Sequence, residues 1–149
     1  MPKMTPMKEV LYIVLHCTST RLSQRWTVED IDRLHKARGW QQIGYHWYVD
    51  QDGNIHEGRK EQYAGAHVRH YNQHAIGVCY EGGIDEKGRY ADTRTPAQKA
   101  SLWFLLKDLK ESYPKAKIVG HRDFPNIRKE CPCFDAQEAY AELNNPKED

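Results

Sequence analysis

The stretch EVLYIVLHC, residues 9–17, decides the fold. Residues 11–15 form an unbroken apolar run that is rich in β-forming side chains, which is typical of a strand buried on both faces. A strand of this kind is covered by a packed layer on each side of its sheet, so it indicates an α/β architecture. The strand is predicted to stop at His16, where polar residues begin.

Helices and further strands alternate along the rest of the chain. Helices are predicted after three N-capping sequences, which are TVED at 27–30, TPAQ at 95–98 and DAQE at 135–138. The first should end near residue 38 and the second before Pro114. A hairpin that turns at Asp52 and Gly53 is predicted at residues 44–59. Two short apolar runs, at residues 75–83 and 116–120, are predicted to be further strands.

The predicted fold is therefore a single α/β domain with a mixed central β-sheet flanked by α-helices, because one pair of strands is a tight hairpin. The domain is expected to span residues 1–149, with a core at about 9–143 and a polar C-terminal tail.

The composition indicates a nearly neutral, water-soluble protein. Lys and Arg number 22 against 21 Asp and Glu, and the mean hydropathy is −0.88. A balanced surface gives no general argument for nucleic acid or an anionic membrane. The apolar run LYIVL is shorter than a secretory core, and no stretch approaches a membrane span. We expect synthesis in the cytoplasm without a signal peptide, no nucleic-acid partner, no membrane insertion and a monomer.

Two histidines and a cysteine form a candidate metal site. His16 and His121 each follow a short apolar strand, and ligands gather at the carboxyl ends of strands in open α/β sheets. Cys131 lies ten residues beyond His121. Two imidazoles and one thiolate suit zinc and leave one coordination position open, as in catalytic sites. On the residues alone, a turn role for each histidine stays open.

Five stretches, in order, resemble the type-2 N-acetylmuramoyl-L-alanine amidases, in the small phage-lysozyme branch. The chain is also similar to peptidoglycan recognition proteins of the same superfamily. The stretches cover roughly residues 10–135 and are VLHCTST, IDRLHKARGWQQIGYHWYVDQDGNIHEGR, YAGAHVRHYNQHAIGVCYEGGID, TPAQKASL and GHRDFPNIRKECPCFD.

The resemblance implies one Zn²⁺ ion held by three residues, which are His16, His121 and Cys131. It implies two catalytic residues, Tyr45 in GYHW and Lys129 in the K-E-C-P motif. In an extended loop Lys129 and Cys131, two apart, would face the same way. The resemblance also implies that His67 lines the cleft and contacts substrate.

The other cysteines receive no catalytic role from the sequence. Cys17 and Cys79 fall in predicted strands and are expected to be inert core thiols. Cys133 stands where the family often has a small residue, and this departure raises the prospect of misligation or of oxidation with Cys131.

The implied activity is zinc-dependent hydrolysis of the amide bond between N-acetylmuramic acid and L-alanine in peptidoglycan. The protein would act on the cell wall after release, in lysis or turnover. Two alternatives stay open. The first is a non-catalytic peptidoglycan-binding module, although members of that kind typically lack the metal thiolate. The second is a metal-free hydrolase that uses Cys131 and His121 as nucleophile and base.

Overall fold

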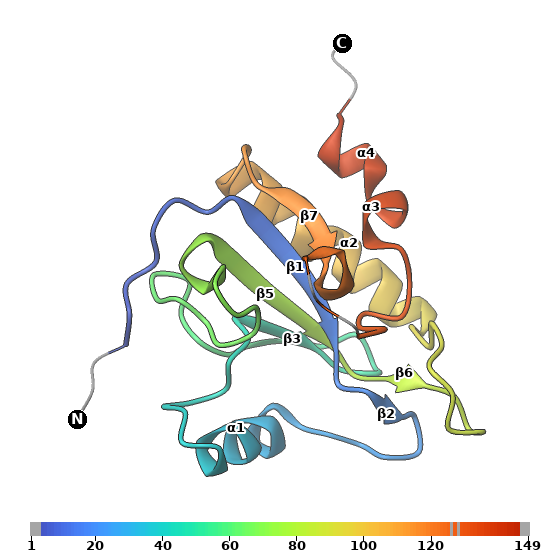
Figure 1. The fold of residues 1–149 in the computed structure, drawn as a ribbon. Helices are drawn as coiled ribbons and strands as arrows, with labels where there is room; N and C mark the ends of the chain where they lie inside the picture. The colour runs from blue at the N-terminus through green and yellow to red at the C-terminus, as the bar shows by residue number, and fades with distance from the viewer. Residues whose placement is uncertain (1–3, 126, 128, 147–149) are drawn as a thin grey trace.

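The computed structural model describes residues 4–125, 127 and 129–146. A five-stranded sheet forms its centre, in the order β4-β3-β5-β1-β7 (Figure 1). The strands are β1 (Tyr12–Cys17), β3 (Trp47–Val49), β4 (Ile55–Glu57), β5 (Ala75–Tyr80) and β7 (Lys117–Gly120). The β3–β4 hairpin is antiparallel and the other pairs are parallel, so the sheet is mixed, as predicted. A second, two-stranded parallel sheet joins β2 (Thr20–Arg21) to β6 (Gly83–Ile84).

Strand β1 lies between β5 and β7 and divides its side chains between the two faces of the sheet. Ile13, Leu15 and Cys17 point toward the cluster that contains the leucines of α2 (Pro96–Ser112). Val14 points to the opposite face, where it packs with Val68 and Phe124. Because side chains alternate along a strand, His16 shares the face of Val14.

Helix α1 (Val28–Ala37) covers the face of the sheet opposite α2 (Figure 1). Its Ile31 packs with Tyr48 of β3 and Cys79 of β5. The helix begins with the predicted capping box, in which the side chains of Thr27 and Asp30 each accept a hydrogen bond from the backbone N–H of the other residue. Gly39, with a φ of +90°, follows the end of the helix. The sheet is thus covered by helices on both faces, as the apolar strand predicts.

Two predicted strand boundaries differ from the structure. β1 continues through His16 to Cys17, because these two residues pair with Cys79 and Tyr80 of β5. The segment predicted as one strand at 75–83 turns after Tyr80, and β6 starts a separate sheet.

The last predicted helix is two short ones, α3 (Ala136–Ala139) and α4 (Ala141–Asn144). They are separated at Tyr140, whose φ of −117° is not helical. The end of the predicted polar tail, residues 147–149, lies outside the described residues. Among the residues described, no helix has both the length and the apolar character that a membrane crossing demands.

The buried side chain of Gln98 fixes α2 against the sheet. Its amide nitrogen donates to the carbonyl of Val49 at 3.3 Å and to that of Glu81 at 2.9 Å. Its amide oxygen accepts the N–H of Thr95, which caps the helix. One side chain therefore joins the start of α2, the end of β3 and the segment after β5.

Replacing Gln98 with Ala should lower the free energy of unfolding by about 3 kcal/mol, because the carbonyls of Val49 and Glu81 each lose a donor, the N–H of Thr95 loses its acceptor, and a cavity is left. Urea denaturation measures this change. The exposed neighbour supplies the control: Lys99→Ala should stay within about 0.5 kcal/mol of wild type. Equal stabilities for the two variants would contradict the role given to the glutamine.

Candidate metal centre and active site

Three side chains that are distant in the sequence meet at the carboxyl edge of the sheet. The ligand atoms of His16, His121 and Cys131 all lie within 4.8 Å of one another, and all three residues are buried. His16 Nδ1 is 3.9 Å from the sulfur of Cys131, and the ring centroids of His16 and His121 are 4.6 Å apart. The structure brings the three predicted ligands together; that they bind metal stays a prediction.

Regular structure holds the two imidazoles. His16 is the penultimate residue of β1, and His121 directly follows β7, where it begins the short 3₁₀ helix η2 (His121–Asp123). Since β1 and β7 are parallel neighbours, their carboxyl ends share one edge of the sheet. The Asp123 carboxylate accepts the N–H of Gly120 at 2.7 Å and closes the turn on which His121 stands.

Cys131 comes from the irregular segment after η2, which returns beside the end of β1. The backbone N–H of Cys17 donates to the Cys131 sulfur at 3.2 Å, and the N–H of Arg122 donates to the Cys131 carbonyl at 3.0 Å. Next along the chain, the Tyr80 hydroxyl donates to the Pro132 carbonyl at 2.6 Å. These bonds tie the segment to β1, η2 and β5 and place the sulfur next to His16.

A chain of hydrogen bonds sets the tautomer of His16. His67 Nε2 lies 3.3 Å from the Ala75 carbonyl, which can only accept, so this nitrogen carries the proton. His67 Nδ1 is then an acceptor, and His16 Nε2, 2.9 Å away, must donate to it. The remaining nitrogen of His16, Nδ1, is left with a free lone pair directed toward Cys131. A metal ligand needs this arrangement.

Close packing holds the ring of His67 in place. A Cβ atom at Gly77 would lie 2.9 Å from the ring, and one at Gly65 would lie 2.6 Å from it, so only glycines fit on both sides. The amide oxygen of Asn72 accepts the N–H groups of His67 and Val68 at 3.0 and 2.8 Å. The sequence predicts substrate contact for His67, which stays a prediction. The contact with His16 was missed, because it depends on packing between distant segments.

Both candidate histidine ligands are neutral at physiological pH. Burial, and then the neighbouring His67, lowers the pKa of His16 well below its ordinary value. Burial and the nearby ammonium of Lys129 lower the pKa of His121 to about 4. Neutral imidazole is the form that binds a metal ion, so the site is prepared before any ion arrives.

The sulfur of Cys131 retains its proton more strongly than an ordinary thiol does. The hydrogen bond with the Cys17 thiol, followed by burial, raises the pKa of Cys131 well above the ordinary thiol range. A metal ion must therefore displace this proton in order to bind. An activated thiol nucleophile has the opposite property, a lowered pKa in a partly exposed position.

The two predicted catalytic residues border the cluster. The Tyr45 ring is partly buried, with its centroid 5.0 Å from that of His16. Burial, and then nearby thiols, raises the pKa of Tyr45 well above its ordinary value, so the phenol keeps its proton and acts as a donor. Lys129 is exposed, and its positive charge contributes to the lowered pKa of both His16 and His121. Both side chains therefore lie near the site, and their catalytic roles stay predictions.

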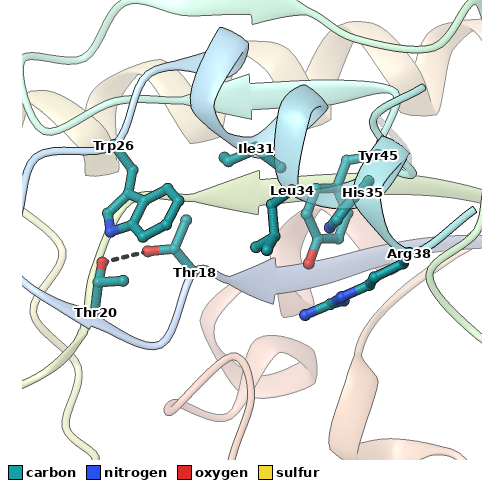
Figure 2. Close-up of a pocket in the computed structure, with 8 residues that line it drawn as sticks. All are labelled: Thr18, Thr20, Trp26, Ile31, Leu34, His35, Arg38 and Tyr45. Carbon is teal, nitrogen blue, oxygen red and sulfur yellow. Dashed lines mark hydrogen bonds between the residues drawn. The ribbon is translucent and has the colours of Figure 1, made fainter. Parts of the chain in front are cut away.

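A hollow of about 110 Å³ lies beside Tyr45, whose ring borders the cluster. Figure 2 shows the residues that line the hollow. Tyr45 belongs to the wall of the hollow and links it to the candidate metal site. The other lining residues come from the segment after β1 and from one face of α1: Thr18, Thr20, Trp26, Ile31, Leu34, His35 and Arg38. His35 Nδ1 accepts the N–H of Gly44 at 2.8 Å, so its other nitrogen carries a proton. The sequence assigned no role to His35 or Arg38, although the helical spacing of 31, 34, 35 and 38 indicates one common face.

The fold and the cluster define an α/β protein with three buried candidate metal ligands at the carboxyl edge of its sheet, next to a hollow. The sequence profile of the N-acetylmuramoyl-L-alanine amidase family matches residues 6–134. The chain belongs to this family, as the resemblance predicts.

Curated and solved relatives agree with this assignment. The endolysin of Escherichia phage T7 is 42% identical over 123 residues, which cover 83% of this chain and 80% of the endolysin. The endolysin amidase LysCS of Clostridium intestinale URNW superposes with a TM-score of 0.81 at 33% identity, over 96% of this chain and 89% of LysCS. Peptidoglycan recognition protein-LE, solved in complex with tracheal cytotoxin, superposes with a TM-score of 0.75 at 25% identity. The superposition covers 95% of this chain and 85% of the recognition protein.

Two variants of His67 test its role in positioning His16. His67→Leu fills the space without an acceptor and should weaken zinc binding by about 10–100-fold, since partners behind a ligand have effects of this size. His67→Gln keeps an acceptor and a donor and should recover part of the loss. Competition with a chromophoric chelator measures the affinity, and thermal unfolding of the zinc-free variants reports any general loss of stability. Zinc binding by His67→Leu as tight as wild type would refute the role.

Zinc affinity should increase with pH by about tenfold per unit between pH 6 and pH 8. The imidazoles are already neutral in this range, whereas the Cys131 thiol must lose a proton, and proton competition weakens as pH rises. The same competition assay at several pH values gives the slope. Cys131→Asp is the matched control, because its carboxylate is ionised throughout and its profile should be flat. A flat profile for the wild type would show that no proton leaves the sulfur.

Proposed function

We propose that this chain, as one domain over residues 1–149, cleaves the amide bond between N-acetylmuramic acid and L-alanine in peptidoglycan with the help of one bound zinc ion. The family supplies the reaction. The observation that carries the zinc dependence is the convergence of His16, His121 and Cys131 within 4.8 Å.

The donor set fits zinc. Two neutral imidazole nitrogens and one sulfur are ligands that zinc prefers, and three protein ligands leave a position for water or substrate. A zinc ion held there would polarise the amide carbonyl and lower the pKa of a water molecule. The protein contributes a buried site, neutral imidazoles and the fixed orientation of His16.

Tyr45 would act as a hydrogen-bond donor at the reacting amide. Its raised pKa excludes a role as base at neutral pH, whereas a phenol that keeps its proton can orient the carbonyl or the departing amine. Lys129 would stabilise negative charge that develops on the carbonyl oxygen, because it is a cation near both imidazoles.

The hollow beside Tyr45 would hold the part of the substrate next to the scissile bond. Trp26 and Leu34 offer apolar surface, and Arg38 offers a guanidinium that can pair with a carboxylate of a stem peptide. Peptidoglycan recognition protein-LE was solved in complex with tracheal cytotoxin, a monomeric diaminopimelic acid-type peptidoglycan, which supports a muropeptide as the ligand class. His67, which is partly exposed, is proposed to contact substrate as well.

The site of action would be the cell wall, which the protein reaches after release from the cytoplasm. We propose that it does so as a monomer, without nucleic-acid partners and without inserting into the membrane.

A metal-free thiol hydrolase is the second candidate, because the Cys131 sulfur lies 3.9 Å from a nitrogen of His16. The raised pKa of the thiol and its 8% exposure argue against it, since a nucleophilic cysteine is more exposed and more acidic. The retained set of ligand residues also argues against a module that only binds peptidoglycan.

Elemental analysis combined with mass spectrometry of digested sacculi tests the proposal. The wild type should contain one zinc per chain and release peptides that begin with a free alanine amine. His16→Ala should lose both zinc and activity, because one imidazole ligand is gone. Peptides without that amine, or full activity after complete removal of zinc, would overturn the mechanism.

Two further variants separate catalysis from metal binding. Tyr45→Phe and Lys129→Met should retain zinc but lose about 100–1000-fold in kcat, since each removes a donor to developing charge. The matched controls are two exposed residues, in Tyr90→Phe and Lys107→Met, which should keep wild-type activity. Loss of zinc from the Tyr45 or Lys129 variant, or unchanged kcat in either, would contradict the roles given to them.

A further inference from the structure

Two cysteines outside the proposed ligand set lie against each other. The sulfur of Cys17 is 3.8 Å from that of Cys133, although 116 positions separate them in the sequence. Cys17 ends β1 and directly follows the ligand His16, and Cys133 stands two residues after the ligand Cys131. The pair therefore joins the two chain segments that carry two of the three ligands.

The surroundings accommodate two sulfur atoms at this place. Cys17 points to the face of the sheet opposite His16, and Gly83 lies beside it. A Cβ atom at Gly83 would stand 2.7 Å from the Cys17 sulfur and 3.5 Å from that of Cys133, so the glycine leaves the room that both thiols occupy. Cys133 sits in a turn with a φ of +72°, closed by its N–H bond to the Glu130 carbonyl.

The two thiols differ in access. Cys17 is 5% exposed and Cys133 is partly exposed. An oxidant in solution thus meets Cys133 first, and Cys17 is placed behind it as the second thiol. Cys131 is the competing partner, because its sulfur also hydrogen-bonds the Cys17 thiol, but the proposed zinc ion would engage that sulfur together with His16 and His121.

We propose that Cys17 and Cys133 are a redox site that forms a disulfide on exposure to a peroxide, and that this bond fastens the ligand-bearing segment to β1. The inference rests on the proposed function in one respect, which is that the ion held by the fastened segment is zinc.

The chemistry balances with one peroxide molecule. The Cys133 sulfur attacks hydrogen peroxide, the O–O bond breaks, and a sulfenic acid and one water form. The Cys17 sulfur then attacks the sulfenic sulfur, the S–O bond breaks, and a second water leaves. The two thiols lose two electrons and two protons in total. The sulfurs must approach by roughly 1.8 Å, from 3.8 Å to the ~2.05 Å of a disulfide.

The bond would act on the least regular part of the metal site. A link between residues 17 and 133 closes a long loop and restricts the unfolded chain, which stabilises the folded state. It also prevents the segment of Cys131 from moving away from His16 as a unit. Oxidation should therefore raise the thermal stability and slow the loss of zinc.

The test uses the full-length, zinc-loaded protein, first reduced and then treated with one equivalent of hydrogen peroxide. Free thiols are alkylated, the chain is digested without reductant, and mass spectrometry identifies linked peptides. We expect a Cys17–Cys133 pair, a Tm about 5–10 °C higher that dithiothreitol reverses, and zinc release to a chelator at least threefold slower.

Cys133→Ser is the matched control, because it removes one sulfur from a partly exposed position. Its Tm and zinc release should not respond to peroxide, and its reduced form should behave as the reduced wild type. Cys17→Ser provides the same test from the buried side. Neither needs a cell-wall substrate, so an inactive protein with the linked pair would reject the proposed function and leave this inference intact.

Other results would overturn the inference. A Cys17–Cys131 link, a dimer joined through Cys133, or sulfinic acid without a disulfide would show that the pair does not form. The expected link without a change in Tm or in zinc release would show that the bond does not fasten the segment.

Discussion

The site depends on how β1 divides its side chains between the two faces of the sheet. A strand that is buried on both faces must place alternate residues in different environments. In β1 the odd positions enter the apolar layer of α2, and the even positions face the loops, where His16 meets His67 and His121. A shift of one residue in the pairing with β5 would send Cys17 to the cluster and His16 into the leucines.

Burial of several imidazoles is costly unless each is neutral and hydrogen-bonded. Burial lowers the pKa values of His16 and His67, and hydrogen bonds engage His16 Nε2 and both ring nitrogens of His67. His46 shows the pattern away from the ligands. It accepts the N–H of Gly77 at Nδ1, and its Nε2 lies 2.8 Å from the carbonyl of Tyr63. The same desolvation that disfavours a charged histidine thus leaves His16 and His121 in the neutral form that a metal ligand needs.

The sequence predicts an element of structure correctly where the pattern that specifies it lies within a few neighbouring residues. The capping boxes, the turn at Gly53 and the apolar run of β1 all act within a few residues, and the structure places them as predicted. The family resemblance supplied the three candidate ligands. What the sequence missed depends on packing between distant segments: His67 behind His16, the face of α1 toward the hollow, and the partner of Cys133. The sequence raised misligation by Cys133 or its oxidation with Cys131, whereas the structure places the Cys133 sulfur 3.8 Å from that of Cys17.

The three candidate ligands are not held equally well. His16 lies within a strand and His121 directly follows one, whereas Cys131 lies on an irregular segment whose preceding residues, Lys129 and Glu130, are exposed. Cys131 is therefore supported by the hydrogen bonds that it accepts from Cys17 and Arg122 and by the packing of the residues after it. The Tyr80 hydroxyl donates to the Pro132 carbonyl. Phe134 is buried, and the guanidinium carbon of Arg94 lies 3.5 Å from the centroid of its ring. The candidate catalytic residue Lys129 therefore lies on the exposed side of Cys131, and the buried residues that pack this segment against the domain lie on the other side.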